Sequence, residues 1–125
     1  MTRRTTLNLA LAFSILGIVA VAQPAAAWQP PERKDCYDGF STANGCPWNG
    51  NLTPRDLQQL SCQNLAHMRN RIYDQNGYCF TRPDLKAEYN QDGCRHHIQL
   101  LVPLNRFERE NIRRIRRTER TKRCD

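Results

Sequence analysis

Six cysteines are spread through a short chain, and this feature limits the possible folds more than any other. The chain has 125 residues, and its first cysteine is Cys36. An even number of cysteines in a small exported chain favours disulfide bonds over metal ligands or reactive thiols. No Cys-x-x-Cys motif occurs, which argues against zinc binding, haem attachment and thioredoxin-like chemistry. Three disulfides are therefore expected if the chain is exported.

The N-terminus has the three parts of a secretory signal peptide. Arg3 and Arg4 precede an apolar run, and alanines at 25–27 form a cleavage site. The run is short and interrupted by polar residues, which suits a cleaved segment better than a membrane anchor. We predict a signal peptide over residues 1–27 and a periplasmic or extracellular protein. Residues 28–125 make one small domain, which gains stability from covalent links.

Residues 28–50 contain several prolines and glycines and show no helical or alternating period. We therefore predict an irregular N-terminal strap. Its aromatic residues Tyr37, Phe40 and Trp48 are expected to anchor it to the rest of the domain, with a ligand-stacking role as the alternative.

Residues 51–125 carry the signals of about four helices, so the predicted fold is mainly α. Thr53 precedes a proline and caps a first helix that runs to about Leu60. Ser61 caps the second helix, which stops at the Asn76 and Gly77 pair. We predict a third helix over residues 82–89, capped by Thr81, and a last helix from residue 104 or 105 to about Thr121. Residues 94–102 are predicted to form a loop that can include a short extended piece.

The second helix and the turn after it carry a family motif. The motif residues are Arg69, Asn70, Ile72, Tyr73, Gly77, Tyr78 and Phe80, with Leu85, Tyr89, Leu104, Asn105, Glu108, Asn111 and Ile112 further on. This pattern resembles the YARHG domain, a small module of exported bacterial proteins whose molecular role is unsettled. The chain departs from the family where Asp74, Gln75 and Asn76 replace the Ala-Arg-His triplet. A cysteine, Cys94, stands where the family has a tryptophan, as in a cysteine-bearing branch.

The order of the helices suggests how the six cysteines pair. Cys36 and Cys46 share the strap. Cys79 follows the second helix and Cys94 follows the third, so a return of the chain brings them together. Cys62 begins the second helix and Cys124 follows the last, which fits an antiparallel pair of helices. We predict the disulfides Cys36–Cys46, Cys62–Cys124 and Cys79–Cys94 among fifteen possible pairings.

The last predicted helix is strongly basic. From residue 106 to residue 125 there are nine basic and four acidic side chains. Arginines line the side opposite the apolar stripe: Arg106, Arg109, Arg113, Arg116, Arg117 and Arg120. Guanidinium groups pair well with phosphate and carboxylate. The sequence thus suggests a non-enzymatic module that binds an anionic envelope partner, and an ordinary solvated helix face is the alternative. Candidate partners are lipopolysaccharide, a membrane surface, peptidoglycan or another envelope protein, and the predicted export disfavours nucleic acid.

Three histidines offer a different function. His67, His96 and His97 would suit a small hydrolase or ribonuclease, because paired histidines can serve as general base and general acid. No known nuclease spacing is present, and the helical wheel places His67 on the solvent side. We expect no catalytic residue, metal site or cofactor. A structural or inhibitory protein that binds another protein through its strap is a third hypothesis.

Two charged residues interrupt the apolar stripes of the second and last helices. These residues are Arg69 and Glu108, and we predict that they form a buried ion pair, with Asn111 satisfying the remaining polar groups. We also assign structural roles to Tyr73, Gly77 and Phe80.

Overall fold

The computed structural model describes residues 36–37 and 44–125. The predicted signal peptide, residues 28–35 of the strap and Phe40 lie outside the described residues. The described part is mainly helical, as predicted. Its elements in order are α1 (Pro54–Gln58), α2 (Cys62–Gln75), α3 (Pro83–Glu88), the short 3-10 helix η2 (Gln99–Leu101) and α4 (Arg106–Lys122). None of these helices is long and apolar enough to cross a bilayer.

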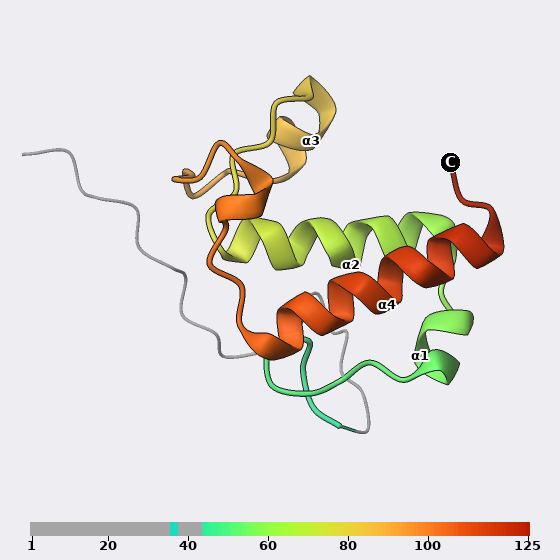
Figure 1. Cartoon of the computed structure of the whole chain (residues 1–125). Coiled ribbons are helices and arrows are strands. Elements are labelled where there is room, and N and C mark those ends of the chain that lie inside the picture. Colours follow the sequence, from blue (N-terminus) through green and yellow to red (C-terminus); the bar gives the residue numbers. More distant parts are fainter. Residues whose placement is uncertain (1–35, 38–43) are drawn as a thin grey trace, which may run out of the picture.

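The two long helices form the body of the domain. α2 and α4 lie side by side and run in opposite directions, with α1 at one end of the pair and α3 at the other (Figure 1). Their facing sides supply the main buried residues: Leu65, Met68, Ile72, Ile112 and Ile115. These residues recur at three- and four-residue spacing, which places them on one side of each helix.

Most helix starts agree with the caps read from the sequence. Thr53 forms a reciprocal capping box with Asp56, and the Ser61 hydroxyl accepts a hydrogen bond from the backbone of Asn64. The third helix differs. Its N-cap is Arg82 rather than Thr81, because Pro83 occupies the first helical position and holds the residue before it in an extended conformation.

α2 ends as the sequence predicted. Gly77 has φ of 79°, a left-handed conformation that is easiest for glycine. Its amide donates to Asp74 O and the next amide, Tyr78 N, donates to Tyr73 O. These two bonds form a Schellman motif, which satisfies the last carbonyls of α2 and turns the chain back over the core.

All three predicted disulfides are confirmed. Cys36 pairs with Cys46, Cys62 with Cys124, and Cys79 with Cys94. The second bridge links Cys62, the first residue of α2, to Cys124, two residues beyond the end of α4. It therefore sets the antiparallel register of the two long helices.

The segment between α3 and α4 is a loop, with one isolated bridge between Tyr78 and His96 and the single turn of η2. Val102 is buried after this turn. η2 lies near the end of α2, and the chain runs from it to the start of α4 (Figure 1).

Candidate anion-binding face

The six arginines of α4 named above lie along one side of the helix, and we call this surface the arginine face. All six side chains are exposed. At 100° per residue they fall within an arc of about 100°. The opposite side carries the buried residues of α4: Glu108, Asn111, Ile112, Ile115, Thr118 and Glu119. α4 therefore presents a continuous strip of positive charge.

The arginines differ in how strongly they are held by the protein. Arg113 pairs with Glu110 on the same helix. Arg116 donates weakly to the Tyr73 hydroxyl at 3.5 Å and also contacts Gln99. Within the described part of the chain, no acidic side chain lies within ion-pairing distance of Arg117 or Arg120. Much of the donor capacity of the face thus remains available to a partner.

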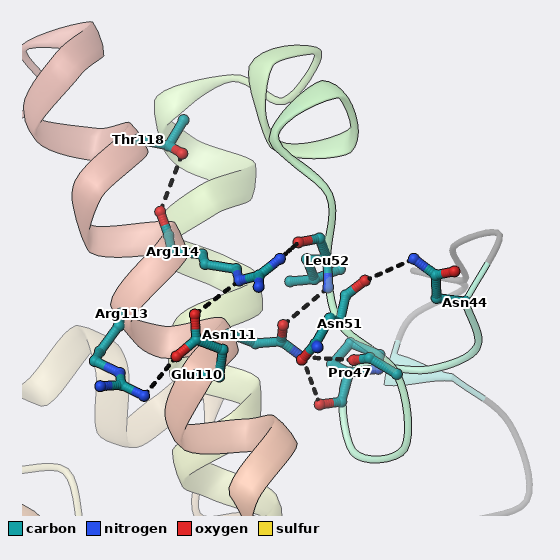
Figure 2. A network of polar contacts seen from close by, with 10 residues as sticks. Asn44, Pro47, Asn51, Leu52, Glu110, Asn111, Arg113, Arg114 and Thr118 are labelled. Atoms are coloured by element: carbon teal, nitrogen blue, oxygen red, sulfur yellow. Dashed lines mark hydrogen bonds and ion pairs between the residues drawn. The ribbon is translucent and has the colours of Figure 1, made fainter.

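The position of α4 is fixed by a polar anchor on its buried side, Asn111. Its Nδ2 donates to Pro47 O and Gly50 O, each at 2.8 Å, and its Oδ1 accepts from Leu52 N at 2.9 Å (Figure 2). The side chain is fully buried. One amide thereby ties the end of the strap and the start of the helical domain to the middle of α4.

Arg114 lies beside the arginine face but has a different role. It donates to Leu52 O at 2.8 Å and to Glu110 at 2.9 Å, and it is half-buried (Figure 2). The hydrogen bond from Arg114, followed by the charge of Arg113, lowers the pKa of Glu110 below its ordinary value. Arg114 therefore joins α4 to the preceding chain and is part of the structure.

The predicted ion pair between Arg69 and Glu108 is wrong. Arg69 instead pairs with Glu119. Glu108 is buried and accepts hydrogen bonds from the Tyr37 hydroxyl at 3.2 Å and from Asn76 Nδ2 at 3.0 Å. The expectation that Asn111 would complete that ion pair is also wrong, since Asn111 bonds the strap.

The helix register explains the error. Because the Cys62–Cys124 bridge joins the start of α2 to the end of α4, residues early in α2 face residues late in α4. Arg69 comes about two turns after Cys62 and therefore meets Glu119. Glu108 lies near the other end of α4 and meets the end of α2. The helical wheel placed both residues on the correct sides of their helices. It carries no information on their positions along the axes of α2 and α4.

The other predicted structural residues lie in the core. Tyr73 and Phe80 are buried, and Phe80 N donates to Asn90 Oδ1 at 2.8 Å. Asn90 was missed by sequence reasoning. It adopts φ of 61°, and its Nδ2 donates to Tyr78 O, so it holds the end of α3 against the turn after α2. Its place before a glycine-containing break was the available signal.

A hollow of about 360 Å³ separates the arginine face from the segment that precedes α4. Arg109, Arg113 and Arg116 line one side of it. Leu100, Val102 and Leu104 line another. A ligand here would meet guanidinium groups and aliphatic side chains together.

The histidines do not converge on one site. The His67 ring lies 3.0 Å from Glu88 and 2.7 Å from the Tyr89 hydroxyl, so it links α2 to α3 rather than facing solvent alone. Burial, followed by the charge of Glu88, raises the pKa of Tyr89 to about 12. The hollow around His67 is lined by neither His96 nor His97. Among the described residues, no cluster of three His, Cys, Asp or Glu side chains could hold a metal ion.

The fold and this face together define a small, disulfide-linked helical module that presents an arginine-rich helix. The chain belongs to the YARHG domain family, whose model matches residues 47–120. The match confirms the resemblance seen in the sequence, and it begins at Pro47, whose carbonyl bonds Asn111. Comparisons with curated proteins and with solved structures found no match.

Proposed function

We propose that this protein is a non-enzymatic binding module that attaches to an anionic partner in the cell envelope through the arginine face. The observation that carries the proposal is the alignment of six exposed arginines on one side of α4. Charges gathered on one surface attract an anionic surface more strongly than the same charges scattered over the molecule. The three disulfides and the family are compatible with an exported protein.

A histidine-dependent hydrolase is the alternative, and the geometry gives it less support. General acid and base catalysis by two histidines needs both within reach of one substrate. The Nδ1 atom of His67 is already engaged by Glu88 and Tyr89. The other two histidines belong to a different segment, so we propose no catalytic residue.

The test compares two variants that lose the same charge at different places. In the face variant, Arg113, Arg117 and Arg120 are replaced by glutamine, while Arg116 is kept because it contacts Tyr73. In the matched control, three exposed basic residues elsewhere are replaced: Arg55, Arg82 and Lys86. Binding is measured to dextran sulfate, a soluble polyanion, and to cell-envelope extract, each at low and high salt.

The face variant should bind dextran sulfate several-fold more weakly than the control, and binding of the native protein should fall with added salt. Exposed charges are screened over about 10 Å at 0.1 M salt, which is why the salt dependence reports on them. Equal losses in the two variants would show that only net charge matters and would refute a dedicated face. The proposal would also be refuted if the amount of protein bound to envelope extract were the same at low and high salt and the same for the native protein and the face variant.

A further inference from the structure

Three aliphatic side chains at the η2 turn are exposed although most apolar residues of the domain are buried. The exposed fractions are 57% for Ile98, 95% for Leu100 and 66% for Leu101. They are the large hydrophobic residues that the described part of the chain leaves exposed. Scattered exposed leucines are ordinary, but adjacent ones on a single protruding turn form a patch that marks an interaction surface. We call these three residues the apolar turn.

The apolar turn is held firmly and adjoins the arginine face. The backbone amide of Leu101 donates to Ile98 O, and that of Val102 donates to Gln99 O. The buried Val102 anchors the turn from below. The side chain of Gln99 contacts Arg116 at 3.4 Å. Leu100 also shares one hollow with arginines of α4, so apolar and cationic side chains belong to one continuous surface.

We propose that this combined surface binds an anionic lipid bilayer, with the apolar turn entering the headgroup layer and the arginine face bonding lipid phosphates. The proposal rests on the proposed function above and names its partner. The charge matches, because guanidinium groups pair well with phosphate. Apolar side chains gain free energy by leaving water at the boundary of the acyl chains.

The shape of the surface favours a bilayer over a protein partner. Leu100 is almost completely exposed at the tip of a single turn, so a protein would need a pocket that matches it. A bilayer accepts such a protrusion without a preformed site. Two backbone amides of the turn are already bonded within it, which lowers the cost of moving the turn into a less polar phase. Long arginine side chains can reach the phosphates from the same position.

The experiment separates insertion from simple attraction of charge. Native protein, L100S/L101S and the matched apolar control L100M/L101M are sedimented with phosphatidylcholine vesicles that contain or lack phosphatidylglycerol. The same proteins are titrated with dextran sulfate, which has no apolar interior. A further variant, L100W, places a fluorophore at the tip, and its quenching by lipids brominated on the acyl chains reports insertion. Thermal melts establish that all variants are folded.

We expect L100S/L101S to bind phosphatidylglycerol vesicles at least about tenfold more weakly than native protein, since full burial of even one of the two leucines is worth about tenfold or more in affinity. L100M/L101M should bind like native protein, and all variants should bind dextran sulfate equally. The tryptophan of L100W should be quenched by the brominated lipids.

Other outcomes overturn the proposal in distinguishable ways. If L100S/L101S binds vesicles like native protein, or L100W is not quenched, the turn does not insert, although the arginine face can still bind anions. If native protein binds dextran sulfate but not vesicles, the partner is a polyanion rather than a bilayer. Loss of an envelope protein from pull-downs of L100S/L101S, with vesicle binding unchanged, would assign the turn to a protein partner. Binding to neither probe would refute the proposed function as well.

Discussion

Replacing Asn111 with aspartate should destabilise the domain in a strongly pH-dependent way. The change keeps the shape of the side chain but removes the two N–H donors that bond Pro47 O and Gly50 O. An ionised carboxylate would face two carbonyl oxygens in a fully buried position. A protonated carboxyl can donate to one of them. The folded protein should therefore hold this group protonated, with a pKa raised well above its unfolded value.

The size of the effect follows from that protonation. An unfolded aspartate has a pKa of about 3.9, so holding it protonated at pH 7 costs about 4 kcal/mol. The lost hydrogen bond adds about 1 to 3 kcal/mol, because one buried carbonyl stays without a donor. The free-energy cost of keeping the introduced aspartate protonated is absent below the pKa of the unfolded aspartate and grows as the pH rises above that pKa. The deficit should thus be about 1 to 3 kcal/mol near pH 3 and about 5 to 7 kcal/mol near pH 7.

Urea unfolding of native protein and N111D at a series of pH values gives this difference directly, with disulfides intact. The matched control is N64D, which makes the same chemical change at an exposed position in the first turn of α2. An acidic residue there is neutral or slightly stabilising. A deficit for N111D that is below about 1 kcal/mol at pH 7, or that does not change with pH, would show that Asn111 does not anchor α4 as described.

Three further changes test other contacts. R69Q removes the partly buried ion pair between α2 and α4. It should lower the free energy of unfolding by about 1 to 3 kcal/mol, which lies between the values typical of exposed and of buried ion pairs. A loss smaller than the error of urea unfolding would contradict this prediction. C62S/C124S opens a bridge that spans 62 residues and should cost about 4 kcal/mol by chain entropy, which calorimetry would detect as a large drop in the melting temperature. R114Q should raise the NMR titration midpoint of Glu110, because the Arg114 hydrogen bond is the main cause of its lowered pKa; an unchanged midpoint would exclude that cause.

Local structure was predictable from the sequence because its causes are local. The caps at Thr53 and Ser61 and the stop at Gly77 each depend on a residue type at one position. The exposed side of α4 followed from helical periodicity alone. The Cys62–Cys124 disulfide was predictable because antiparallel packing of the second and last helices brings the start of one next to the end of the other.

Contacts between distant segments were harder to predict. The partner of Arg69 depends on how far one helix is shifted along the axis of the other. Hydrophobic periodicity shows which side of a helix is buried but not this axial shift. The predicted bridge between Cys62 and Cys124 did specify the axial shift, because a link at that end of the helix pair brings Glu119 closer to Arg69 than Glu108. The roles of Tyr37 and Asn111 depend on the path of the irregular strap, and no periodic pattern specifies such a path.

The arrangement of acidic residues on α4 makes the arginine face more basic than the composition suggests. Glu108 and Glu119 are buried on the inner side, where they bond the strap and α2. Glu110 lies at the edge, engaged by Arg113 and Arg114. Most of the acidic side chains of α4 therefore stabilise the fold. The arginines on the opposite side make few contacts with the core. Because the same buried acids fix α4, the face is presented on a rigid support, and changing its arginines should alter binding with little effect on stability.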